Sequence, residues 1–178
     1  MHRALVLLLL SACATPNIRA RTTAPGTGSA REVRIEVVNA SGRELPAPRS
    51  GAFDEIAHLT VGRTVPRLST ADAFSAAAAA GLRARGVTAV GGRNPEIPTF
   101  RVTILDFEIR NHDAAGAVAF VSAAYLLLDT RNQSGWEATE TGFPIRLGGP
   151  DLTRSELARI ATEAVNRALA SFPAVLDR

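Results

Sequence analysis

The side chains that could do chemistry are few in this sequence, and the first of them is its single cysteine, Cys13. Because the chain has only this one cysteine, no disulfide within it can help it fold. An unpaired thiol is reactive, and it is a liability in an exported protein unless it has a specific use. The residues around Cys13 therefore decide how this side chain is interpreted.

The residues before Cys13 have the organisation of a secretory signal. Arg3 supplies a positive charge, and residues 4–10 form an unbroken apolar run that ends in four leucines. A membrane-spanning helix needs about twenty apolar residues to cross a hydrocarbon core of roughly 30 Å, so this run is too short to be a permanent anchor. We predict that residues 1–12 are a signal peptide that is removed.

The sequence Leu10-Ser11-Ala12-Cys13 resembles the lipobox of bacterial lipoproteins, in which a leucine and small residues precede the cysteine. The resemblance implies cleavage before Cys13, a diacylglycerol on its thiol and, usually, acylation of the new amino terminus. Two or more acyl chains anchor a protein stably, whereas one gives only marginal binding. The alternative is an ordinary signal peptide in which Cys13 is incidental.

Ala14 and the residues after it indicate which membrane would hold the protein and how far the domain could lie from it. Aspartate after the lipidated cysteine is the inner-membrane retention signal of enterobacterial lipoproteins, so Ala14 favours the periplasmic side of the outer membrane over the inner membrane. Residues 13–30 are small, polar and interrupted by proline and glycine, which predicts a flexible tether. Such a tether would have a root-mean-square span of roughly 20 to 25 Å.

The histidines that remain after signal removal, His58 and His112, do not form a recognisable site. Glu55 and His58 have the Glu-x-x-His spacing of a carboxylate-bridged metal pair, but that chemistry needs a second such pair and two further carboxylates. A zinc protease needs two histidines one helical turn apart. We predict a surface turn at His58, a solvated hairpin turn at His112, and no metal or cofactor.

Other short motifs also lack the pattern of a catalytic site. Gly91-Gly92 has neither the lysine nor the spacing of a phosphate-binding loop, and no Gly-x-Ser-x-Gly nucleophile motif occurs. Glu137 and Glu140 fall on opposite faces of a predicted strand and would not converge on a substrate. Trp136 is either a partner-binding anchor or, as we favour, a residue of the core or sheet edge. We predict no catalytic residue, and we expect that the protein is not an enzyme.

The charge of the chain gives little support to nucleic-acid binding. All twenty basic residues are arginine and the net charge is +3, although the pI is about 10.3. The arginines are scattered among the acidic residues rather than gathered in a basic patch, and an exported location also disfavours nucleic acid. With 46% apolar residues, stability must come from a hydrophobic core.

Hydrophobic periodicity predicts the elements that position these residues. The apolar alternation over 100–110 slips at Ile104-Leu105, which suggests a bulge or burial on both faces. Residues 43–68 read as irregular, with candidates for a helical turn at 53–59 and a short strand at 59–65. Two helices are predicted, over about 70–85 and, after the Thr153-x-x-Glu156 capping box, up to Phe172. Strands are predicted over 31–38, 87–90, 100–110, 117–128 and 136–147.

This order of elements predicts a single α+β domain over residues 31–178. Three consecutive strands with short turns imply an antiparallel sheet of about four to five strands, and two amphipathic helices would pack on one of its faces.

The order and apolar positions of these elements resemble the YajG family of small bacterial lipoproteins. The resemblance rests on the lipobox and tether, the helix at 71–86, the strand at 100–107 and the hairpin that places Trp136 after Asp129 and Gly135. It covers most of residues 31–175 and contains no catalytic motif. Auxiliary lipoproteins of lipid-transporting ABC systems and the LptE lipoprotein of lipopolysaccharide assembly share the outline, although the apolar residues usual after the LptE cysteine are missing here.

The resemblance implies a lipid-anchored envelope lipoprotein that acts as a non-enzymatic binding, assembly or transport-accessory module. Its expected partners are the membrane, through the lipid, and an envelope protein or a lipid that contacts a sheet edge or the helix-free face of the sheet. The alternatives are a hydrolase with a scattered, unrecognised site and an LptE-like component of lipopolysaccharide assembly.

Overall fold

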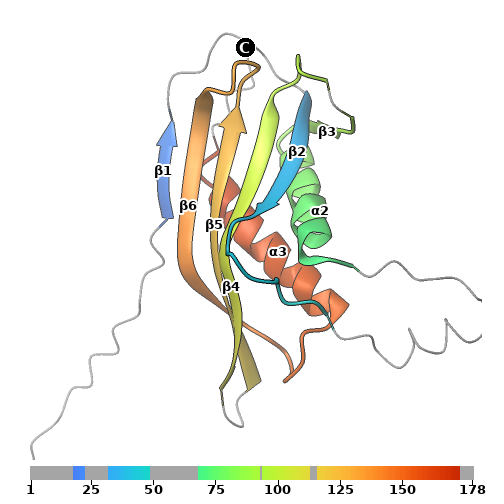
Figure 1. Ribbon diagram of the computed structural model, residues 1–178, viewed down its shortest axis with the longest axis vertical. Coiled ribbons are helices and arrows are strands. Elements are labelled where there is room, and N and C mark those ends of the chain that lie inside the picture. The colour runs from blue at the N-terminus through green and yellow to red at the C-terminus, as the bar shows by residue number, and fades with distance from the viewer. Residues whose placement is uncertain (1–17, 23–31, 49–67, 93, 113–115, 173–178) are drawn as a thin grey trace, which may run out of the picture.

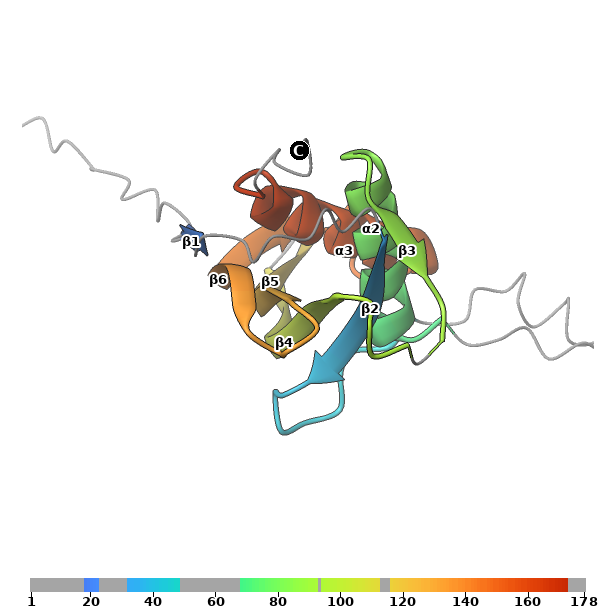
Figure 2. The same cartoon turned by 90° about the horizontal axis from the view of Figure 1, so that it is seen from above.

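In the computed structural model, two helices lie on the same face of one six-stranded sheet (Figures 1 and 2). The structure describes residues 18–22, 32–48, 68–92, 94–112 and 116–172, and for β1 and the last two residues of β4 it describes only the backbone. The strands are β1 (Ile18–Thr22), β2 (Glu32–Asn39), β3 (Thr88–Val90), β4 (Thr99–His112), β5 (Gly116–Leu128) and β6 (Ser134–Arg146), and the helices are α2 (Thr70–Arg83) and α3 (Arg154–Leu169).

The central strand β5 buries one of its two faces under the helices, although its residues are apolar at both odd and even positions. In β5 the odd-numbered side chains from Ala117 to Tyr125 are buried under the helices, and the even-numbered ones are half-buried on the other face. The register between β4 and β5 shifts between Ile104 and Asp106, which confirms the predicted bulge. The extra residue, Leu105, is 41% exposed because the bulge turns it out of the core.

The sheet is mixed, so the prediction of an antiparallel sheet of four to five strands is wrong in part. The strand order is β1-β6-β5-β4-β2-β3, and β2 runs parallel to both of its neighbours. The physical reason is the connection from β2 to β3, which includes α2. A crossover through a helix returns the chain in the same direction, whereas a tight turn reverses it.

The second correction concerns the segment predicted as a flexible tether. Five of its residues, Ile18–Thr22, form β1 and pair antiparallel with residues 136–140 of β6. Without β1, this part of β6 would be an edge of the sheet. An edge strand presents unpaired N–H and C=O groups that a short extended segment can satisfy, and local composition does not reveal such a pairing.

Side-chain caps fix the starts of both helices. Ser69 and Asp72 form a reciprocal capping box at α2. Thr153 caps α3 by accepting a hydrogen bond from the Glu156 N–H. The predicted reciprocal bond from Glu156 is absent, because its carboxylate instead accepts the Gly148 N–H and pairs with Arg159.

The two helices pack closely against each other at Gly81. A Cβ atom on Gly81 of α2 would lie 2.7 Å from Cδ1 of Leu169 in α3, closer than side chains normally approach. The alanine-rich face predicted for residues 70–85 therefore packs against α3 as well as against β2 and β3.

The helical turn and short strand considered for residues 53–65 lie outside the residues that the structure describes. Neither of the two described helices has the length and apolar character needed to cross a membrane.

Candidate functional site

Several residues selected from the sequence cannot be placed. Cys13, Glu55 and His58 lie outside the described residues. His112 ends β4, where its backbone pairs with Gly116, and its side chain is not described. The strand before the predicted turn, β4, therefore extends through His112, so the histidine ends the strand.

Trp136 lies in the core, as the favoured interpretation predicts. Its side chain is fully buried, stacks on Phe100 with ring centroids 6.0 Å apart, and meets Phe172 edge-on at 4.9 Å. Its indole Nε1–H donates to the carbonyl oxygen of Ser171 at 3.1 Å. The residue therefore joins β4, β6 and the end of α3 rather than offering itself to a partner.

Glu140 is a buried carboxylate on the helix-covered face of the sheet. Glu137 and Glu140 do fall on opposite faces of β6, as predicted, but Glu140 shares the helix-covered face with Trp136 and Ala138 and has no exposed surface. It is the one charged side chain in the core among the described residues. The signal was its parity, since it follows Trp136 and Ala138 in steps of two.

Arg167 of α3 compensates the buried carboxylate only in part. Its Nε lies 3.1 Å from Oε1 of Glu140, and its guanidinium carbon lies 3.4 Å from the ring centroid of Phe143. Within the described part of the chain, the Glu140 oxygens and the nearby Tyr125 hydroxyl have no hydrogen-bond partner with good geometry. Burial raises the pKa of Glu140 to about 7, with Arg167 opposing the shift and Glu163 adding to it. Burial, and then the Glu140 charge, raise the pKa of Tyr125 far above its usual value.

We expect this carboxyl group to make stability depend on pH. Because the pKa of Glu140 is higher in the folded state (about 7) than its ordinary 4.5, the folded chain binds more protons between these values. The stabilisation is complete below about pH 4.5 and is lost as pH rises through 7, at up to roughly 1 kcal/mol per pH unit. Urea unfolding of Glu140→Gln across pH 5 to 8 should lack this component. Glu137→Gln, with the same charge change on the other face, should retain it, and equal pH profiles of the two variants would contradict the assignment.

One face of the sheet is covered by no described helix (Figure 2), and it carries both apolar and charged side chains. The β5 strand runs down its middle and half-exposes an apolar row of Val118, Phe120, Ala124 and Leu126. Beside this row, along β4, lie three ion pairs of 2.7 to 2.8 Å: Arg43 with Asp106, Arg101 with Glu36, and Arg110 with Glu108. The exposed large apolar side chains of the described residues are Val38 and Leu105. Strand alternation and the bulge place both on this face.

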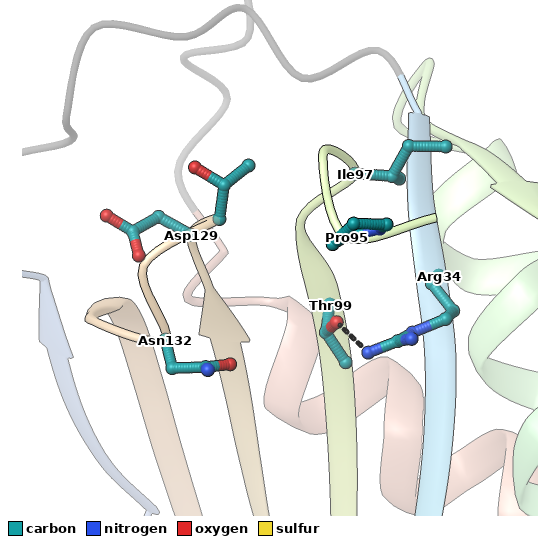
Figure 3. Close-up of a pocket in the computed structure, with 7 residues that line it drawn as sticks. Arg34, Pro95, Ile97, Thr99, Asp129 and Asn132 are labelled. Carbon is teal, nitrogen blue, oxygen red and sulfur yellow. Dashed lines mark hydrogen bonds between the residues drawn. The ribbon is translucent and has the colours of Figure 1, made fainter. Parts of the chain in front are cut away.

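A small polar pocket opens at one end of the sheet, between the loop that enters β4 and the turn from β5 to β6 (Figure 3). Its volume is about 210 Å³. Arg34 of β2 donates from Nη2 to the Thr99 hydroxyl at 2.9 Å. Asn132, with a φ of 59°, points its amide from the opposite wall toward these two residues. The lining residues are Arg34, Pro95, Ile97, Thr99, Asp129, Thr130 and Asn132.

The glycine pair at 91–92 follows β3 as a loop and does not line this pocket. Among the described residues, no three His, Cys, Asp or Glu side chains group as metal ligands.

The comparisons with known proteins concern the fold. No protein-family model and no curated protein matches the sequence, so the YajG resemblance stays a prediction. The structure is similar to the PelC dodecamer from Paraburkholderia phytofirmans, with a TM-score of 0.52, 14% identity, and coverage of 88% of this chain and 96% of that chain. A leucine-to-methionine PelC variant from the same organism is similar with a TM-score of 0.51 and 18% identity, and the match covers 88% of this chain and 95% of that chain.

The chain shares the fold of PelC. A minor lipoprotein from Acinetobacter baumannii is also similar, at 10% identity over 79% of this chain and 94% of that one, with a TM-score of 0.36.

Proposed function

We propose that the protein is a lipid-anchored envelope lipoprotein that acts as a non-enzymatic assembly module on the periplasmic side of the outer membrane. The observation that carries this proposal is the helix-free face of the sheet, where a row of apolar side chains on β5 is half-exposed beside ion pairs on β4. A lipobox-like sequence ending in Cys13 supports the anchoring.

The composition of this face suits contact with another protein surface. Protein interfaces combine an apolar centre with a polar rim, and they rarely leave a charge unpaired at the centre. Here the charges beside the apolar row already have partners: Arg101 pairs with Glu36, and Arg110 pairs with Glu108 while lying over the Phe120 ring at 4.6 Å. Covering the face would therefore bury few unpaired charges.

We propose further copies of the same chain as the occupant of this face. The similar structure of PelC is described as a dodecamer. Association of identical chains through two different surfaces closes into a ring when the rotation between copies permits it. Anchoring every copy to one membrane by its amino terminus would align the copies and favour such closure. Another envelope protein or a lipid is the competing occupant.

The test measures self-association of the full lipidated chain in a non-ionic detergent by analytical ultracentrifugation. We expect a species larger than one chain. Leu105→Glu and Leu126→Glu place a carboxylate on the helix-free face and should shift the chain toward the monomer, because an interface tolerates an unpaired buried charge poorly. Both side chains are at least partly exposed, so the domain should stay folded.

The matched control is Ala76→Glu, which adds the same charge at an exposed position of α2. It should leave the mass unchanged. A monomeric wild-type chain would reject self-assembly, and an oligomer that persists in both face variants would place the interface elsewhere.

A further inference from the structure

The polar pocket at the end of the sheet contains an arginine, Arg34, that has no charged partner in the part of the chain that the structure describes. Arg34 is half-buried, and among the described residues its side chain makes one hydrogen bond, to the Thr99 hydroxyl. Arg43, Arg101 and Arg110 on the same face all pair with carboxylates. A guanidinium group carries five N–H donors in a planar fork, so most of the donors of Arg34 remain available.

The opposite wall of the pocket presents the side-chain amide of Asn132. The Asn132 backbone N–H donates to the Asp129 carbonyl at 3.0 Å, which holds the residue in its left-handed conformation. No hydrogen bond engages its side-chain amide within the described part of the chain. In Figure 3 this amide points toward Arg34 and Thr99. Three polar groups from β2, β4 and the β5–β6 turn therefore converge on one space.

Asp129, the one carboxylate among the lining residues, is hydrogen-bonded within its own turn. Its Oδ1 accepts the backbone N–H groups of Arg131 and Gln133, both at 2.8 Å. Figure 3 shows its carboxylate directed away from Arg34. These bonds build the turn that positions Asn132, and the cationic group that faces the pocket is the Arg34 guanidinium.

We propose that this pocket binds a single oxyanion, a phosphate or carboxylate group, through the guanidinium of Arg34 with the Asn132 amide opposite. A guanidinium fork matches the geometry of both oxyanions and binds them with paired, charge-assisted hydrogen bonds. The volume of about 210 Å³ suits an anionic head group and is small for a whole drug-sized ligand. Pro95 and Ile97 would contact the attached carbon atoms.

The test titrates the full lipidated chain, labelled with ¹⁵N in a non-ionic detergent, with inorganic phosphate, with acetate and with a short-chain phosphatidic acid. We expect amide shifts at residues 34, 99 and 132, and an affinity that weakens as salt rises. Arg34→Gln should reduce the affinity for the anion at least tenfold. Arg34→Lys keeps the charge but lacks the planar guanidinium, so its affinity should lie between those of the wild-type chain and Arg34→Gln.

The control is Arg131→Gln, which removes the same charge from the neighbouring turn without altering the pocket lining. It should bind like the wild-type chain, and melting curves should show that all variants are folded. Tighter binding of phosphatidic acid than of phosphate would name a lipid head group as the ligand source, whereas equal binding would name a soluble anion. No saturable shift at these residues, or equal losses in Arg34→Gln and Arg131→Gln, would overturn the proposal.

Discussion

Replacing Trp136 with alanine should lower the free energy of unfolding by about 3 to 5 kcal/mol, the usual cost of truncating a buried tryptophan or phenylalanine. The indole is fully buried and contacts two other rings, Phe100 and Phe172. Its removal leaves a cavity where β4, β6 and the end of α3 meet. For a domain of this size the melting temperature should fall by roughly 10 °C or more.

The matched variant is Trp136→Phe, which keeps an aromatic ring but loses the hydrogen bond from Nε1 to the Ser171 carbonyl. It should cost less than the alanine variant, about 1 to 3 kcal/mol, because it leaves a smaller cavity and one buried acceptor without its donor. Urea unfolding followed by tryptophan-independent circular dichroism compares the two. A loss below about 1 kcal/mol in Trp136→Ala would contradict the burial of this side chain.

Replacing Cys13 with alanine should release the chain from membranes. If the thiol carries the lipid, the variant loses the diacylglycerol and the later amino-terminal acyl chain, each methylene of which contributes ~0.8 kcal/mol of membrane affinity. The neighbouring apolar run of residues 4–10 is too short to replace that anchor. Membrane flotation together with incorporation of labelled palmitate measures the effect.

Ser11→Ala is the control for this substitution, since it keeps a small residue before the cysteine and should leave lipidation intact. Labelled palmitate in the Cys13→Ala chain would show that the lipid is elsewhere. An unlabelled wild-type chain would favour the ordinary signal peptide with an incidental cysteine.

The elements whose patterns are local could be predicted well. Helix α3 has an apolar residue every three or four positions, and β5 is apolar at both odd and even positions, as a central strand is. The bulge near Leu105 was visible because the apolar phase of β4 slips there. Each of these features depends on residues that are only a few positions apart in the chain, so the pattern can be read directly from the sequence.

The pairings between distant segments could not be predicted in the same way. The five residues of β1 have a weak pattern of their own, and they form a strand only because the edge of β6 offers backbone partners. The parallel position of β2 between β3 and β4 likewise depends on how the chain crosses after α2. Strand neighbours are a property of the assembled sheet, and no local composition encodes them.

By itself, the sequence determined the succession of helices and strands from residue 31 onward, the core position favoured for Trp136 and the prediction that lipid is attached at Cys13. Only the tertiary structure decided that Glu140 is buried beneath Arg167, and that Arg34 and Asn132 face one pocket from positions 98 residues apart (132 minus 34). The physical reason is the range of the interactions. A cap, an alternation or a processing motif is read from adjacent residues, whereas burial of a charge and convergence of donors exist only once the sheet has brought distant strands together.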